Sequence, residues 1–289
     1  MKRILIPVFL AVTGMAAAVL YAGSDPMPAT SIGAGPSTAA YLQFNEIFTG
    51  DWQQYGQLFT SLQQNLFPRL FLLVITIVPV LFFLHYIAIG PISIPHDGKQ
   101  VYCYNLFVRI IHWCTALSFS LLVITGLFVF FGSFVGSGAL GILGRNIHFV
   151  SAIACVASAF FMFLFWVKDM LPALYDLKWI MIMGGYLSKE VKPVPAGKFN
   201  AGQKMWFWLA ILGGAVMAVT GYFLYILQGN IDILRLSSMI HNALGAVIVA
   251  MFLIHLYMSI VAIKGSLGSM INGYKNETEL KILHSRFKY

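Results

Sequence analysis

Beyond an apolar stretch at the N-terminus, five long runs of apolar residues alternate with shorter polar segments along the chain. The runs cover residues 70–89, 110–131, 147–167, 205–227 and 239–263. Each has about 20 to 25 residues, enough for an α-helix with a rise of 1.5 Å per residue to cross a hydrocarbon core about 30 Å thick. The pattern therefore predicts five transmembrane helices, within which Pro79 is tolerated because neighbouring groups can repair the backbone bonding.

The N-terminal stretch, residues 4–22, follows Lys2 and Arg3 and ends in small residues. It predicts a signal peptide or an uncleaved anchor over residues 1–22. Residues 23–68 are polar and aromatic, and we expect a periplasmic segment with an interfacial helix. An extra transmembrane helix over 69–90, a four-helix core over 105–264 and a cytoplasmic tail over 265–289 complete the predicted organisation.

Composition narrows the class of protein further. The 289 residues are 59% hydrophobic and only 10% charged, with a mean hydropathy of +0.82, whereas about a quarter of residues are charged in an average soluble domain. A soluble enzyme is excluded, and the fold class that we predict is an all-α membrane protein, a transmembrane helix bundle. Three cysteines are too few and too scattered for a disulfide framework or a zinc site.

The net charge of +8 is informative by location and does not indicate a nucleic-acid partner. We consider an orientation in which the N-terminus is cytoplasmic and the helix over residues 70–89 runs from the outside to the inside of the membrane. In this orientation 15 of the 18 Lys and Arg residues fall on the cytoplasmic side. Basic residues in short loops mark the side that stays in the cytoplasm. The chain is therefore expected to cross a bacterial cytoplasmic membrane several times and to end in the cytoplasm.

Five of the seven histidines lie within or at the ends of the apolar runs: His85, His112, His148, His241 and His255. An ionisable residue in a membrane span is a candidate functional residue because it is costly there without a partner. For any single histidine the alternative is a hydrogen bond across helices.

The spacing of these histidines favours metal ligation. His241 and His255 are 14 residues apart, about 21 Å of rise and close to four turns, so they share a helix face at two depths. By depth, His112 matches His255 at the inner side and His148 matches His241 at the outer side. Two histidine pairs at two depths suit two b-type hemes with bis-histidine ligation. Zinc fits less well because no thiolate or carboxylate completes a tetrahedron, and a proton relay lacks acidic residues within the runs.

Other residues near the histidines carry weaker signals. Arg109 and Arg145 each precede a histidine by three residues, so each lies on the histidine's face and is either a partner for a heme propionate or an interfacial anchor. Gly126 and Gly245 either let a flat macrocycle approach the backbone or serve helix packing. His85 has a depth similar to that of His112, so depth alone leaves it open as the ligand opposite His255.

At this point the chain resembles the cytochrome b (gamma) subunit of membrane-bound respiratory formate dehydrogenases, in a long form with an N-terminal extension. The resemblance covers about residues 109–274 and rests on five motifs: Arg109-Ile-Ile-His112-Trp113, Gly144-Arg-Asn-Ile-His148, Phe199-Asn-Ala-Gly-Gln-Lys-Met-Trp-Phe-Trp208, His241 with Gly245 and His255-Leu-Tyr-Met258, and Lys264-Gly-Ser-Leu-Gly-Ser-Met-Ile-Asn-Gly273. The N-terminal extension and the tail after Gly273 depart from the shorter members of this family.

The resemblance implies two hemes b, with His148 and His241 as ligands of the outer heme and His112 and His255 as ligands of the inner one. It also implies a menaquinone site contacted by Asn200, Gly202, Gln203 and His255. For the same run, the residues themselves predict a helix N-terminal cap at Asn200, and the two roles are compatible.

The function that follows is electron transfer in anaerobic respiration. Electrons from an iron-sulfur subunit, and ultimately from a molybdenum or tungsten catalytic subunit that oxidises formate, are expected to pass through two hemes to menaquinone at the cytoplasmic side. One alternative keeps the hemes and changes the donor to a nickel-iron hydrogenase or a thiosulfate or polysulfide reductase. An alternative of another class is a heme-free membrane anchor or transporter.

Overall fold

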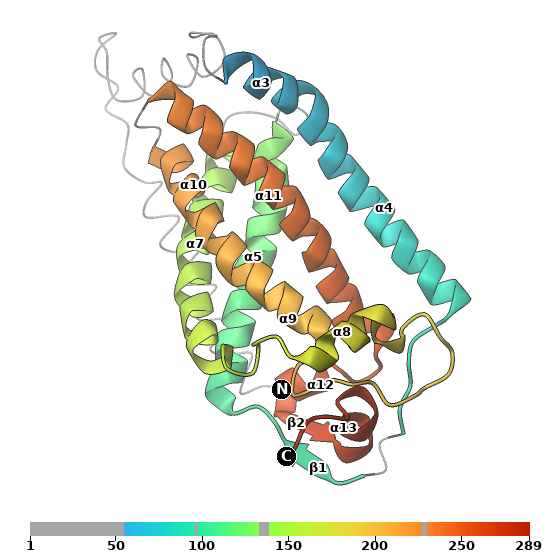
Figure 1. The fold of residues 1–289 in the computed structure, drawn as a ribbon. Coiled ribbons are helices and arrows are strands. Elements are labelled where there is room, and N and C mark those ends of the chain that lie inside the picture. Colours follow the sequence, from blue (N-terminus) through green and yellow to red (C-terminus); the bar gives the residue numbers. More distant parts are fainter. Residues whose placement is uncertain (1–54, 96–97, 133–138, 227–229) are drawn as a thin grey trace, which may run out of the picture. The chain divides into compact units, whose positions relative to one another are not determined.

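Figure 1 shows the fold in a computed structural model, which describes residues 55–95, 98–132, 139–226 and 230–289. The predictions of a signal peptide or anchor over residues 1–22 and of a periplasmic segment up to residue 54 lie outside the described residues.

Within the described residues, five helical stretches are long and apolar enough to cross a membrane. They are Gly56–Ala88, Leu106–Phe130, Ala139–Trp166, Ala201–Ile226 and Ile231–Ala262. Each contains one of the five apolar runs almost entirely, so the prediction of an all-α membrane protein with five spanning helices is confirmed. Large apolar side chains face outward from these helices, as Phe83 does with 62% of its surface exposed, which is expected where lipid replaces water.

The first span is one continuous helix made of α3 (Gly56–Ser61), the π-helical turn η1 (Leu62–Leu66) and α4 (Phe67–Ala88). This helix therefore begins at Gly56, well ahead of the apolar run at 70–89. Pro79 lies inside α4 without ending it, as expected for a membrane helix.

The other four spans are α5 (Leu106–Phe130), α7 (Ala139–Trp166), the series α9 (Ala201–Trp208), η3 (Leu209–Gly213) and α10 (Gly214–Ile226), and the series α11 (Ile231–Tyr257) and η4 (Met258–Ala262). Both series contain a turn of π-helix, a feature that occurs often near functional sites. Gly126 and Gly221 lie within α5 and α10 without interrupting them.

The chain divides into two compact units, and each spanning helix has residues in both. Unit 1 comprises Met1–Leu72, Ala116–Val156 and Gly214–Val247; unit 2 comprises Leu73–Thr115, Ala157–Gly213 and Ile248–Tyr289.

Unit 1 is held together by both apolar and polar contacts between its helices. Phe71 of α4 packs against Phe130 of α5, with ring centroids 4.7 Å apart. Gln63 of η1 donates a hydrogen bond to Ser238 of α11 at 2.8 Å. Arg235, only 1% exposed, lies 3.2 Å from where a Cβ on Gly56 would stand, so glycine gives α3 a close approach to this guanidinium.

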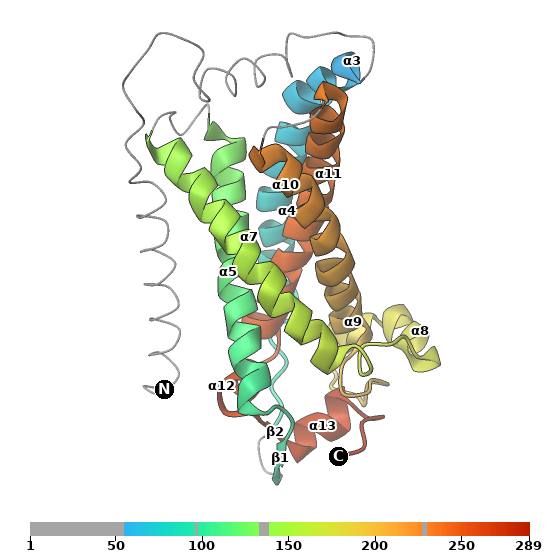
Figure 2. The ribbon, with the colours of Figure 1, turned by 90° about the vertical axis from the view of Figure 1, so that its left-hand side faces the viewer.

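Unit 2 carries short elements that join its helix ends. Besides α8 (Leu174–Met181), η2 (Met183–Gly185) and α12 (Gly268–Asn272), it holds β1 (Gln100–Tyr102), β2 (Tyr274–Asn276) and α13 (Glu277–Leu283). The two strands pair antiparallel, with Val101 opposite Lys275, and they lie beside α12 and α13 (Figures 1 and 2). Hydrophobic patterning did not predict this small sheet, because strands of three residues have no readable period.

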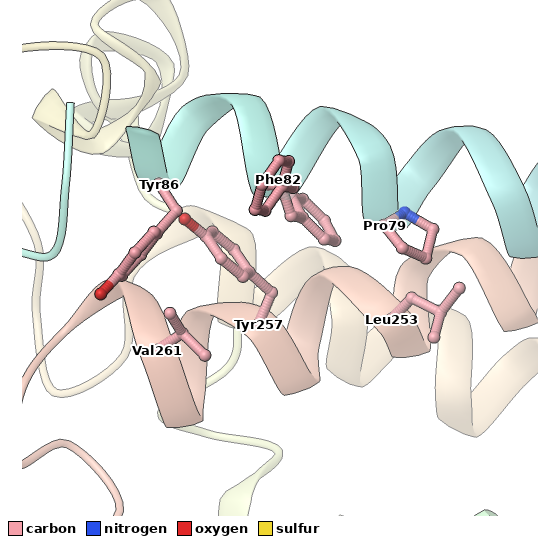
Figure 3. A pocket seen from close by; sticks show the side chains of 7 residues that line it. Pro79, Phe82, Tyr86, Leu253, Tyr257 and Val261 are labelled. Carbon is pink, nitrogen blue, oxygen red and sulfur yellow. The ribbon is translucent and has the colours of Figure 1, made fainter. Parts of the chain in front are cut away.

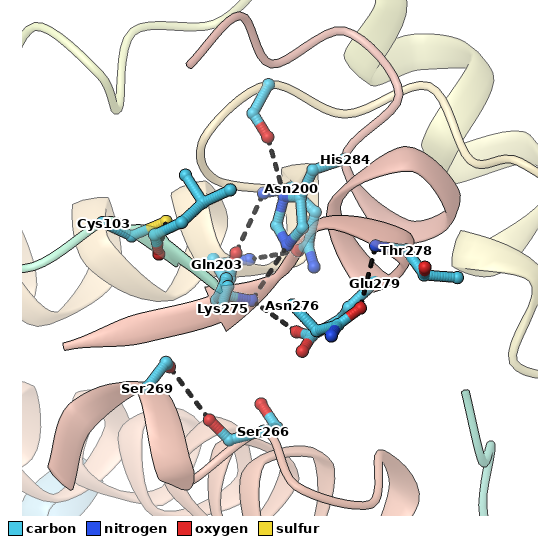
Figure 4. A network of polar contacts seen from close by, with 12 residues as sticks. Cys103, Asn200, Gln203, Ser266, Ser269, Lys275, Asn276, Thr278, Glu279 and His284 are labelled. Carbon is cyan, nitrogen blue, oxygen red and sulfur yellow. Dashed lines mark hydrogen bonds and ion pairs between the residues drawn. The ribbon is translucent and has the colours of Figure 1, made fainter. Parts of the chain in front are cut away.

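The tail after Gly273 is folded onto unit 2 by a buried polar network (Figure 4). Lys275 Nζ forms an ion pair with Glu279 at 2.8 Å and lies 3.3 Å from His284 Nε2. His284 Nδ1 donates to the Gly197 carbonyl at 2.7 Å. All three side chains are buried, and a buried charge needs such partners to be tolerated.

Burial, together with the neighbouring Lys275 ammonium, lowers the pKa of His284 to about 3. The imidazole is therefore neutral in the folded state, with Nε2 free to accept from Lys275. Since the folded pKa lies below the ordinary value of 6.5, the stability that the neutral ring contributes is complete above pH 6.5 and is lost as the pH falls below it.

We therefore expect the tail of the detergent-solubilised protein to open at low pH. Between pH 7.5 and pH 5, docking of residues 274–289 should lose about 2 kcal/mol, at 1.4 kcal/mol per pKa unit, and limited proteolysis at each pH should show faster cleavage there. In the His284→Gln variant, which keeps a donor for the Gly197 carbonyl, cleavage should depend less on pH. Equal pH dependence in the two proteins would contradict this assignment.

Candidate functional site

Unit 1 brings His148 of α7 and His241 of α11 together. Their ring centroids are 6.4 Å apart, with the ring planes at 58°. A bond from a metal to an imidazole nitrogen is about 2 Å long, so this separation fits one metal atom between two rings. The two side chains are only partly exposed within helices that cross the membrane.

Each of these imidazoles is held at Nδ1 by a threonine. Thr125 Oγ1 of α5 lies 3.0 Å from His148 Nδ1, and Thr220 Oγ1 of α10 lies 2.9 Å from His241 Nδ1. Because Nδ1 is engaged, Nε2 is the nitrogen of each ring left for a ligand. A neutral imidazole bonded in this way is the usual form of a metal-ligating histidine.

Unit 2 contains both residues of the second predicted pair, His112 of α5 and His255 of α11, and His255 is close enough to act electrostatically on His112. The His255 ring stacks on Trp206 of α9 at 5.6 Å and 19°, and the His112 ring lies 6.3 Å from Trp166 of α7. His112 Nδ1 is buried and has no hydrogen-bond partner among the residues that the structure describes. A buried nitrogen in this state is an unexplained polar group unless another molecule occupies the site.

The donor set at both pairs fits heme better than zinc. Two imidazoles per site match the axial ligation of a heme iron, and within the described part of the chain no three His, Cys, Asp or Glu side chains gather as a metal site. Among the described cysteines, none forms a disulfide.

The two glycines named from the sequence have different surroundings. A Cβ on Gly126 would stand 3.1 Å from His148 Cε1, whereas one on Gly245 would stand 3.7 Å from Met217 and Phe71. Gly126 therefore allows a close approach to a candidate ligand, and Gly245 serves ordinary helix packing in unit 1.

The two arginines also differ. Arg109 donates through Nη1 to the Ile271 carbonyl at the end of α12, while its Nε is buried without a hydrogen-bond partner among the described residues. Arg145 is exposed and lies over the Tyr225 ring, 5.9 Å from its centroid. For both arginines, contact with a heme propionate stays a prediction. Arg109 also has a structural contact, because it connects α5 to α12.

His85 of α4 is fully engaged in protein contacts. Its Nε2 lies 2.8 Å from the Tyr186 carbonyl, and its Nδ1 lies 2.6 Å from the Tyr257 hydroxyl. Since a carbonyl only accepts, Nε2 carries the proton and Nδ1 accepts from Tyr257. Neither nitrogen is left for iron, which favours His112 over His85 as the partner of His255.

The run from Asn200 to Gln203 forms the predicted cap of α9. Asn200 Oδ1 accepts from the Gln203 backbone N–H, and the Asn200 N–H donates to Gln203 Oε1, both at 2.9 Å. This reciprocal pair is a capping box. Gly202 is needed because a Cβ there would stand 2.9 Å from the Trp179 ring.

Two features of unit 2 were not found from the sequence. Lys204 and Asp176 form a buried ion pair at 2.8 Å that also anchors the start of α8 through the Ala173 N–H. An open apolar groove of about 590 Å³ lies along α4 and α11 (Figure 3). It is lined by Pro79, Phe82, Phe83, Tyr86, Leu253, Tyr257 and Val261. Lys204 was visible only as a charge, since pairing with a residue 28 positions away leaves no local signal.

Comparison with known proteins identifies the family of this chain. The prokaryotic cytochrome b561 family model matches residues 103–273. The cytochrome b556 subunit of the nitrate-inducible formate dehydrogenase of Escherichia coli K12 is 32% identical over 198 residues, 66% of this chain and 91% of the relative. The formate dehydrogenase cytochrome b556 subunit of Haemophilus influenzae is 29% identical over 193 residues, 62% and 78% of the two chains.

Five helices able to span a membrane among the described residues, together with the family match, define a multi-pass membrane protein of the cytochrome b type. The chain belongs to the prokaryotic cytochrome b561 family, in the group of formate dehydrogenase cytochrome b subunits. Membership of this family implies heme b as the cofactor.

If His85 is a structural residue, replacing it should leave the hemes in place. The His85→Ala variant should show the reduced-minus-oxidised spectrum and heme content of the wild type, whereas His112→Ala should lose one heme b. The measurement is pyridine hemochrome quantification of both purified variants. Loss of one heme from His85→Ala, with His112→Ala unaffected, would show that the pairing with His255 is wrong.

Proposed function

We propose that this chain is the membrane subunit of a formate dehydrogenase that passes electrons through two hemes b to menaquinone. The observation that carries the proposal is the close His148–His241 pair in unit 1, with His112 and His255 both in unit 2, in a chain of this family. Heme b, when bound at each pair, supplies a one-electron carrier.

In this proposal His148 and His241 are the axial ligands in unit 1, and His112 and His255 are those in unit 2. The protein's own contribution is to hold the four imidazoles neutral and oriented in an apolar surrounding. The aromatic rings of Trp166 and Trp206 border the unit 2 pair, which keeps that pair in a dry environment. Arg109 and Arg145 are candidate partners for the propionates.

The distribution of Lys and Arg supports an orientation in the bacterial cytoplasmic membrane with the C-terminal tail in the cytoplasm. The unit 1 pair then lies toward the periplasm, where an iron-sulfur subunit and a molybdenum or tungsten subunit would deliver electrons from formate. Inward movement of electrons, with protons taken up from the cytoplasm on quinone reduction, is electrogenic at roughly 2.3 kcal/mol per charge per 100 mV.

Menaquinone would bind in unit 2 at Asn200, Gly202, Gln203 and His255. The start of α9 supports this, because the first turn of a helix presents free backbone N–H groups to a carbonyl oxygen. The amide NH₂ groups of Asn200 and Gln203 add donors beyond the oxygens used in the capping box. The open groove along α4 and α11 is apolar enough for an isoprenoid tail.

The donor can be tested on the intact complex. A preparation isolated through a tag on this chain should contain an iron-sulfur subunit and a molybdenum or tungsten subunit, and formate should reduce its hemes as fully as dithionite does. If the preparation contained a nickel-iron subunit instead, and its hemes were reduced by hydrogen but not by formate, the complex would be a hydrogenase and the proposed electron donor would be wrong. If the wild-type protein contained no heme, the function that remains would be that of a membrane anchor or transporter.

The two roles of Asn200 can be separated by substitution. Asn200→Ser keeps a capping hydroxyl and removes the amide donors, so the melting temperature should stay unchanged while KM for a menaquinone analogue rises about fivefold, the equivalent of one hydrogen bond of about 1 kcal/mol. Asn200→Ala should in addition lose about 1 kcal/mol of stability. Unchanged menaquinone kinetics in Asn200→Ser would restrict this residue to the cap.

A further inference from the structure

The two helices that face the unit 1 histidines carry the same dipeptide. Thr125-Gly126 on α5 faces His148, and Thr220-Gly221 on α10 faces His241. The repeat continues to a phenylalanine two residues after each glycine. Both threonines are buried, at 7% and 6% exposed.

The direction of each hydrogen bond follows from the other contacts of the threonines. Thr125 Oγ1 donates to the Leu121 carbonyl at 2.6 Å, and Thr220 Oγ1 donates to the Val216 carbonyl at 2.9 Å. A hydroxyl has one proton to donate, so toward the imidazole each Oγ1 is an acceptor. The proton between them therefore belongs to Nδ1 of His148 and of His241.

Backbone carbonyls reinforce this assignment. The Leu122 carbonyl is hydrogen-bonded to His148, and the Met217 carbonyl is hydrogen-bonded to His241. A carbonyl can only accept, so each of these contacts also requires a protonated ring nitrogen. Each imidazole is thus fixed in the tautomer whose Nε2 carries the lone pair.

The glycine of each dipeptide lies against the edge of the facing imidazole ring. A Cβ on Gly126 would stand 3.1 Å from His148 Cε1, and one on Gly221 would stand 3.3 Å from His241 Cε1. Both distances are tighter than an ordinary van der Waals contact. Glycine therefore lets the helix backbone approach the edge of the ring, while the preceding threonine holds its nitrogen.

We propose that Thr125 and Thr220 are positioning residues that set the tautomer, orientation and basicity of the two imidazoles in unit 1. The inference rests on the proposed function, in which these imidazoles are the axial ligands of one heme. An acceptor on Nδ1–H makes the ligand more basic and favours ferric over ferrous iron. The threonines should thus lower the potential of the unit 1 heme and leave that of the unit 2 heme unchanged.

The experiment is an optical redox titration of the purified complex with Thr125→Val and Thr220→Val, which keep side-chain shape and remove the hydroxyl. Each variant should retain two hemes, with the midpoint potential of one raised and that of the other unmoved. The double variant should show the larger shift. Thr125→Ser and Thr220→Ser should restore the wild-type potential. Ser120→Ala is the matched control, since Ser120 on α5 also donates to a carbonyl four residues earlier.

The outcomes separate this inference from the proposed function. Two hemes with wild-type potentials in both valine variants would overturn the positioning role and leave the ligand assignment standing. Loss of one heme in the valine variants, with both hemes and normal potentials in the serine variants, would support the role of the hydroxyl. An equal shift in the valine and serine variants would overturn it. A wild-type protein with fewer than two hemes would overturn the proposed function itself.

Discussion

The structure depends on placing imidazoles inside helices that cross a membrane. A polar ring in an apolar surrounding is costly unless its nitrogens have partners. The unit 1 pair meets this requirement by bonding Nδ1 to threonines on adjacent helices. His85 meets it with a carbonyl and a tyrosine hydroxyl. Among these histidines, His112 alone keeps a buried Nδ1 without a partner among the described residues, so its ring has less support from the protein than the others.

The same principle shapes the polar part of unit 2. The buried ion pair Lys204–Asp176 joins α9 to α8, and the buried ion pair Lys275–Glu279 joins β2 to α13. Breaking a buried pair by removing one partner leaves an uncompensated charge, so these contacts define one arrangement of the loops around the start of α9. That arrangement places the capping box of Asn200 and Gln203, and with it the proposed quinone site, on a support held by buried ion pairs. Arg109, bonded to the end of α12, adds a further connection to the same support.

Much of this could be predicted from the sequence, since a membrane span has a length and composition that local pattern alone reveals. The five spans were predicted in this way, the cap at Asn200 was predicted from its residue type ahead of a helix, and the family was inferred from its resemblance in five motifs. The early start at Gly56 was missed because residues 56–66 mix polar and apolar side chains, and Arg235, which packs against Gly56, is remote in sequence. The β1–β2 pair, the buried tail and the threonines beside His148 and His241 depend on contacts between distant residues. The repeated Thr-Gly dipeptide is a signal that the sequence does contain for these threonines. Its role becomes clear only when the structure places each dipeptide beside a histidine.

The central claim is that each unit holds one heme between two imidazoles. Pyridine hemochrome quantification of the purified complex, for the wild type and for His241→Ala, tests it most directly. The account predicts two hemes b per chain in the wild type and one in the variant, with the remaining heme spectrally unchanged. One heme in the wild type, or two in His241→Ala, would contradict it.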